Sequence, residues 1–132
     1  MNIVWKYKID LADENVFSTI EKDRNIQIPQ DLKELIKEGN AATPDKYKYI
    51  IGSTEKVVGA ILSFNKDEKE ADSVYTALSV IEDKNLMPFA IDPFGNYICL
   101  EINSNNVVYW DHESGDVFST EKNIEEFIKS LY

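Results

Sequence analysis

The sequence predicts an α+β domain in which a mostly antiparallel sheet of about five to six strands is covered by helices on one side. Three observations lead to this fold class. Helical periodicity dominates the first part of the chain, consecutive short strands dominate the second, and an amphipathic segment closes it. Separate runs of helices and strands are typical of α+β domains, and we expect the other face of the sheet to be open to a partner.

The N-terminal part is expected to hold a short strand or extended arm and two helices. Apolar residues alternate with polar ones from Ile3 to Ile9, which fits a strand. Asp13 can cap a helix from Glu14 to about Lys22, because apolar side chains then share one face. A second helix begins at Ile28-Pro29, with proline at the first helical position, and ends at Gly39-Asn40.

The middle of the chain has weaker signals. The β-rich runs 49–51 and 57–62 indicate a strand, a loop, and then a second strand or short helix. The charged run 67–72 is expected to begin a solvated helix, because apolar residues continue it at helical spacing as far as Ile81.

Residues 87–101 predict a β-hairpin around the turn 92–96. Pro93 presets φ for an early turn position and Gly95 tolerates a positive φ, while apolar runs flank the turn on both sides. The turn is therefore interpreted as a scaffold element rather than as an active-site loop.

The last part of the chain continues the antiparallel meander. Residues 107–110 are expected to form a strand that turns through 113–116 and pairs back at Val117-Phe118. Ser119 or Thr120 then caps a final helix, whose apolar residues recur at i, i+3, i+4 and i+7.

Length and charge restrict the possible classes of function. The 132 residues suit one domain, and the net charge of −10, from 24 acidic and 14 basic residues, opposes binding to nucleic acid or an anionic membrane. A positively charged protein is the favoured partner. The N-terminus has no signal-peptide pattern, no apolar run reaches membrane-spanning length, and Cys99 is the only cysteine, so we expect a cytoplasmic protein.

The chain has few residues suited to catalysis. His112 is the only histidine, and its neighbours Asp111 and Glu113 could hold a cation only with ligands from elsewhere. Cys99 lies in an apolar run typical of the core, and no phosphate-binding loop is present. We therefore expect no catalytic, cofactor or metal site. A metal-dependent hydrolase that uses Asp111, His112 and Glu113 is the enzymatic alternative.

Several short motifs occur in an order that resembles the SUKH superfamily, from roughly Val16 to Leu131. This superfamily contains bacterial toxin-immunity proteins and a fungal cell-wall assembly regulator. The matching positions are Ile20-Glu21, Ile28-Pro29, Leu32, Leu35, Asn40, Met87-Pro88-Phe89-Ala90, Asp92, Gly95-Asn96, Leu100-Glu101, Val107, Asp111-His112-Glu113, Phe127 and Leu131. Ala41-Ala42 replaces the usual Gly-Gly, which brings the positive φ of that turn into question. Asn96 and Glu101 stand where Asp is commoner.

The resemblance implies an immunity protein without enzymatic activity that neutralises a cognate secreted polymorphic toxin, often a nuclease, by tight direct binding. The alternative is an intracellular scaffold or regulatory module with no toxin partner. Because one fold serves many toxins, we expect the shared motifs to be structural and exposed acidic or aromatic residues to bind the partner. The positions predicted to bind are Glu101, Trp110, Asp111, Glu113 and Asp116, with Asp67, Glu68 and Glu70 as a second patch.

Overall fold

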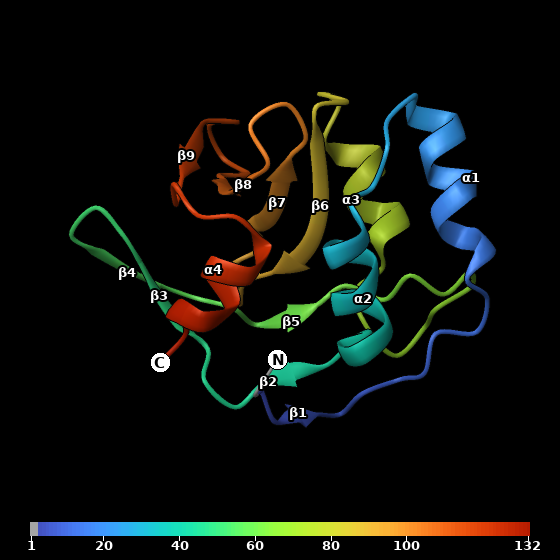
Figure 1. Cartoon of the computed structure of the whole chain (residues 1–132), viewed down its shortest axis with the longest axis horizontal. Coiled ribbons are helices and arrows are strands. Elements are labelled where there is room, and N and C mark those ends of the chain that lie inside the picture. Colours follow the sequence, from blue (N-terminus) through green and yellow to red (C-terminus); the bar gives the residue numbers. More distant parts are fainter. Residues whose placement is uncertain (1–2) are drawn as a thin grey trace.

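The computed structural model describes residues 3–132 and has the α+β architecture that the sequence predicts (Figure 1). Its elements, in chain order, are β1 (Trp5–Lys6), α1 (Asn15–Arg24), α2 (Gln30–Gly39), β2 (Thr43–Pro44), β3 (Lys48–Ile51), β4 (Thr54–Val57), β5 (Ala60–Ile61), α3 (Val74–Val80), β6 (Leu86–Ile91), β7 (Tyr97–Glu101), β8 (Asn106–Trp110), β9 (Val117–Ser119) and α4 (Ile124–Ser130). Among the described residues, no helix is both long enough and apolar enough to cross a membrane.

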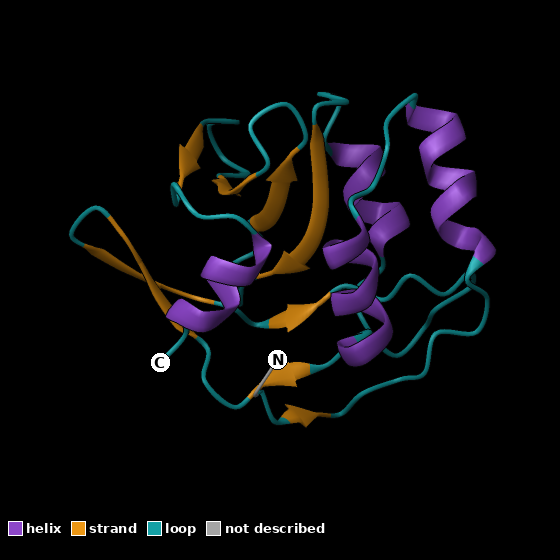
Figure 2. Cartoon of the chain, in the orientation of Figure 1, coloured by secondary structure: helices purple, strands orange, loops and turns teal. Residues whose placement is uncertain are grey.

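The main sheet has five antiparallel strands in the order β5-β6-β7-β8-β9 (Figure 2). The strands β6 to β9 follow one another along the chain, as the predicted meander requires. At the β5 end, the backbone N–H of Ile61 donates to the carbonyl of Ala42 at 2.9 Å, which extends this side of the sheet. At the opposite end, all three residues of β9 are exposed.

The central strands are covered on both faces. Consecutive residues are buried in 86–90, 97–100 and 107–109, and successive residues of a strand point to opposite faces. Helix α3 packs against β6, and α4 packs against β8. The prediction of an open sheet face is therefore wrong for the central strands. Exposed sheet surface remains mainly at β9.

Asn40 joins three parts of the chain at the end of α2. Its fully buried side chain donates from Nδ2 to the carbonyl of Ile9 at 2.9 Å and accepts at Oδ1 from the N–H of Phe64 at 2.8 Å. The next residue, Ala41, has a φ of 62°. The turn thus keeps a positive φ although alanine occupies it, at a steric cost of roughly 1–2 kcal/mol relative to right-handed backbone.

The charged run 67–72 does not begin a helix, contrary to the sequence prediction. The Glu68 carboxylate accepts hydrogen bonds from the Ser63 hydroxyl at 2.7 Å and from the backbone N–H groups of Lys69 and Glu70. Such local bonds compete with helix formation. Helix α3 begins only after Ser73, whose Oγ accepts from the N–H two residues later at 3.1 Å.

Three other boundaries differ from the predictions. The N-terminal strand is limited to β1, after which Tyr7 adopts a φ of 65°. Pro29 is the residue before α2 rather than its first helical residue. Helix α4 is capped by Asn123 in a capping box with Glu126, because the Thr120 hydroxyl instead donates to the carbonyl of Val107 at 2.7 Å.

We predict that Asn40→Ala lowers the free energy of unfolding by about 2–4 kcal/mol, because the change leaves the buried N–H of Phe64 and the partly buried carbonyl of Ile9 without these partners. Urea denaturation followed by circular dichroism measures this loss. Asn103→Ala is the matched control, since Asn103 is exposed, and it should change stability by less than about 0.5 kcal/mol. Equal stability of the two variants would show that Asn40 does not hold the three segments together.

Candidate partner-binding surface

Two turns meet at one end of the five-stranded sheet. The turn 92–96 joins β6 to β7, and the turn 111–116 joins β8 to β9. Both lie at the same end, because Tyr97 at the start of β7 pairs with Trp110 at the end of β8. These two turns, together with Trp110 and Val117, form the tip surface.

Asp92 organises the first turn from within. Its carboxylate is almost fully buried and accepts from the N–H groups of Phe94 at 2.8 Å and Asn96 at 2.9 Å through Oδ1. Its Oδ2 accepts from Asn96 Nδ2 at 3.1 Å. Gly95 has a φ of 87°, which closes the turn as the sequence predicts. The Phe94 side chain is left 73% exposed on a fixed backbone.

Asn96 connects the first turn to the second. Since its Nδ2 donates to Asp92, its Oδ1 is oriented toward His112 and accepts from the His112 backbone N–H at 3.0 Å. His112 Nδ1 lies 2.6 Å from the same oxygen, so Nδ1 carries the proton and donates. The only histidine of the chain therefore holds the two turns together.

The structure brings together four of the residues that the sequence predicts to bind a partner. Trp110 is partly exposed and packs against the ring of Tyr97, with centroids 5.9 Å apart. Asp111 accepts from the N–H of Glu113 at 2.8 Å and thereby shapes its turn. The side chains of Glu113 and Asp116 are exposed, and neither forms an ion pair with another residue in 3–132.

Glu101 does not join this group. It pairs with Asn106 at the other end of β7, four residues from Tyr97, which is roughly 13 Å along an antiparallel strand. Its carboxylate accepts from the Ser104 hydroxyl at 2.6 Å. Glu101 therefore lies at the other end of the sheet from Trp110, because strand direction separates them.

The second predicted patch lies in the loop between β5 and α3. Asp67 and Glu70 are exposed there, whereas the hydrogen bond from Ser63 lowers the pKa of the Glu68 carboxyl and marks it as a brace of the loop. Burial, and after it the charge of Asp72 at the end of this loop, raises the pKa of Tyr97 at the start of β7.

Sequence reasoning missed the most exposed apolar residues of the tip surface. The sequence pattern places Phe94 in a scaffold turn and Val117, which is 40% exposed, in a pairing strand. The available signal was the phenylalanine itself, since a large apolar residue between proline and glycine in a turn has no core to enter.

Asp111, His112 and Glu113, the residues of the hydrolase alternative, do not form a metal site with other described residues. Within residues 3–132, no three side chains of His, Cys, Asp or Glu converge in a way that could hold a metal ion. The Asp111 carboxylate and the His112 ring both hold turns in place. Burial raises the pKa of the Cys99 thiol, as expected for a core cysteine.

Comparison with known proteins supports the family resemblance. The SUKH_6 family model, described as SMI1-KNR4 cell-wall, matches residues 14–128 and so includes both turns of the tip surface. The SPbeta prophage-derived uncharacterized protein YokK of Bacillus subtilis (strain 168) is 24% identical over 136 aligned residues, covering 84% of this chain and 71% of that protein. Because the family match spans most of the chain, the protein belongs to the SUKH_6 family of SMI1-KNR4 proteins.

Proposed function

We propose that the protein is a cytoplasmic immunity protein that neutralises a cognate secreted bacterial toxin by binding it at the tip surface, without catalysing a reaction itself. The observation that carries this proposal is the exposed Phe94 on a turn that is held by hydrogen bonds to the buried Asp92 carboxylate. The adjoining turn carries the carboxylates of Glu113 and Asp116, which form no ion pair within residues 3–132. Membership of the SUKH family supports the same reading, because the family resemblance implies immunity proteins.

The charge of the chain indicates the class of toxin. A net charge of −10 and acidic residues at the tip complement a basic surface, such as the cleft with which a nuclease holds its polyanionic substrate. Electrostatic steering of this kind raises association rates toward roughly 10⁸ M⁻¹s⁻¹ at low salt. A nuclease is therefore the toxin that we propose.

The rigidity of the tip favours tight binding. Ordering a flexible loop at an interface costs free energy, and a turn that is already held by its own hydrogen bonds avoids most of that cost. Exposed aromatic side chains at the centre of an interface commonly contribute much of the binding energy. Phe94 would supply such an anchor, and the surrounding carboxylates would orient the partner.

The second candidate function is an intracellular scaffold without a toxin. The SMI1-KNR4 cell-wall description of the matching family favours it. Purification of the tagged protein from its natural host distinguishes the two: an immunity protein retains a toxin encoded beside its own gene, whereas a scaffold retains only unrelated host proteins.

We predict that Phe94→Ala weakens binding to the toxin encoded in the neighbouring gene by about 30-fold, or about 2 kcal/mol, because the change removes the exposed anchor. Calorimetry gives the affinity, and protection in a toxin activity assay gives the functional loss. Tyr7→Ala, which removes an 83% exposed aromatic from the N-terminal segment, should bind like the unaltered protein. Unchanged binding by Phe94→Ala would exclude the tip surface as the docking site.

We also predict that Glu113→Gln combined with Asp116→Asn slows association roughly threefold to tenfold at low salt and flattens its salt dependence, with little change in dissociation. Stopped-flow measurements over a range of salt concentrations test this. Asp23→Asn with Glu82→Gln removes the same amount of charge from exposed positions on and after the helices α1 and α3. If both double variants slow association equally, total charge rather than the tip surface steers the toxin.

A further inference from the structure

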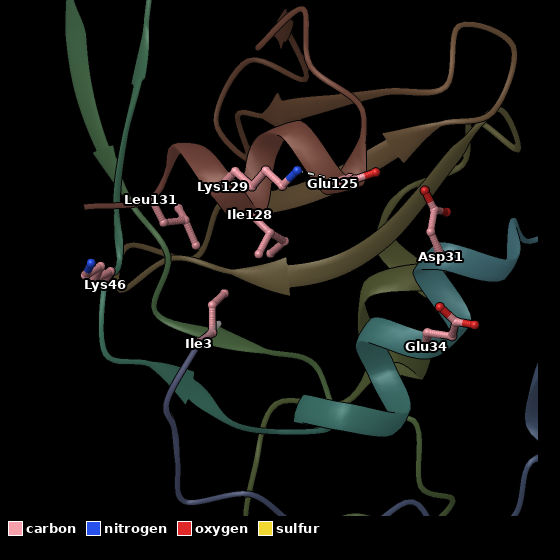
Figure 3. A pocket seen from close by; sticks show the side chains of 8 residues that line it. All are labelled: Ile3, Asp31, Glu34, Lys46, Glu125, Ile128, Lys129 and Leu131. Atoms are coloured by element: carbon pink, nitrogen blue, oxygen red, sulfur yellow. Dashed lines mark hydrogen bonds and ion pairs between the residues drawn. The ribbon is translucent and has the colours of Figure 1, made fainter. Parts of the chain in front are cut away.

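A separate pocket of about 540 Å³ lies between α2 and α4 (Figure 3). Its lining comes from both helices, from Ile3 near the N-terminus and from Lys46 before β3. These segments are far apart in the sequence, and none of their residues belongs to the tip surface.

Carboxylates gather at one end of this pocket. Asp31 of α2 and Glu125 of α4 point toward the gap between the two helices, and Glu34 lies one helical turn beyond Asp31 (Figure 3). The Oδ1 atom of Asp31 is buried and has no hydrogen-bond partner among the described residues. Because buried carboxylate oxygens normally accept a hydrogen bond, this atom is available to a donor that enters the pocket.

The middle of the pocket is aliphatic. Ile128 and Leu131 of the C-terminal segment and Ile3 lie between the acidic end and Lys46 (Figure 3). A ligand that fits this arrangement has a cationic head group on a hydrocarbon stem.

The ammonium group of Lys129 already lies at the acidic end of the pocket, and a ligand can displace it. Lys129 Nζ lies 2.9 Å from Glu125 Oε1, and this hydrogen bond lowers the pKa of the Glu125 carboxyl. The two side chains are 74% and 64% exposed, so solvent screens the pair and it holds Lys129 only weakly. Glu125 is therefore available to a better donor.

We propose that this pocket receives the side chain of an arginine from the protein partner. A guanidinium is planar and carries five donors, so one guanidinium can donate to both Asp31 of α2 and Glu125 of α4. The ammonium of a lysine would form only the kind of bond that Lys129 already forms with Glu125. The three-carbon stem packs on Ile128 and Leu131. This inference rests on the proposed function for the source of the arginine, but the chemistry of the pocket can be tested without any toxin.

The test titrates the ¹⁵N-labelled protein with N-acetyl-arginine N-methylamide and follows amide chemical shifts. We expect saturable shifts in the first turn of α2 and in α4, with a Kd on the order of 1 mM. The citrulline analogue has nearly the same shape without the charge and should cause no such shifts. Equal binding of the citrulline analogue, or no saturable shift with the arginine compound, would overturn the proposal.

Variants make the assignment specific. Asp31→Asn should raise the Kd at least tenfold, while Lys129→Ala should lower it about twofold to threefold because Glu125 loses its competitor. Asp23→Asn, on α1, should leave the Kd unchanged, and thermal unfolding checks that each variant is folded. An unchanged Kd for Asp31→Asn would overturn the proposal.

Two further measurements separate the possible sources of the guanidinium and the two proposals. Free arginine that binds tenfold tighter than the blocked compound would identify a metabolite site and overturn a partner's side chain as the ligand.

Asp31→Asn should also weaken binding to the toxin encoded in the neighbouring gene. A toxin that binds and is inhibited while the arginine compound causes no shift would overturn the pocket proposal alone. If this protein binds the arginine compound but no toxin, the pocket binds guanidinium groups and the immunity proposal is overturned.

Discussion

The buried carboxylate of Asp92 is the constraint on which the tip surface depends. Its two oxygens take three donors, from Phe94 N–H, Asn96 N–H and Asn96 Nδ2, and hydrogen bonds to a charged group are worth roughly 1.5–3 kcal/mol each. The last bond also orients the Asn96 amide, so that Oδ1 is presented to His112. The position of the second turn thus follows from the first, and a carboxylate that is almost fully buried sets the shape of the exposed surface.

The fold was predictable where its signals are local. The hairpin around 92–96 follows from proline and glycine chemistry between two apolar runs, and α2 follows from its apolar periodicity and its glycine. The helix predicted to begin at 67–72 does not form, because Glu68 accepts hydrogen bonds from Ser63 and from nearby backbone N–H groups. Helical spacing in the sequence does not reveal this competition. The prediction of an open second face failed for another reason. Coverage of the sheet depends on contacts between elements far apart in sequence, such as the contact of Phe127 of α4 with Tyr49 of β3.

The candidate site was predictable to the extent that its residues are neighbours in the chain. Trp110, Glu113 and Asp116 stay together because one strand and its turn contain them. Glu101 lies apart from them, since its place in the sheet depends on the strand register, which its exposure does not reveal. The carboxylates of the pocket come from the helices α2 and α4, and no sequence pattern predicts that these two helices are in contact. Local patterns therefore identify surfaces made by one segment and miss those that two segments share.

Under the proposed function, the separation of buried and exposed residues at the tip would let one fold serve different partners. Asp92 and Asn96 are 6% and 7% exposed and hold the turns, so replacing either would leave buried donors or acceptors unpaired. Phe94 and Glu113 stand on the same turns but make no side-chain bonds within the described chain, so replacing them costs little stability. If the tip binds the partner as proposed, changes in partner preference would accumulate at the exposed positions while the hydrogen bonds of the turns are kept. Turns that are already ordered would then keep the entropic cost of binding low for each new partner.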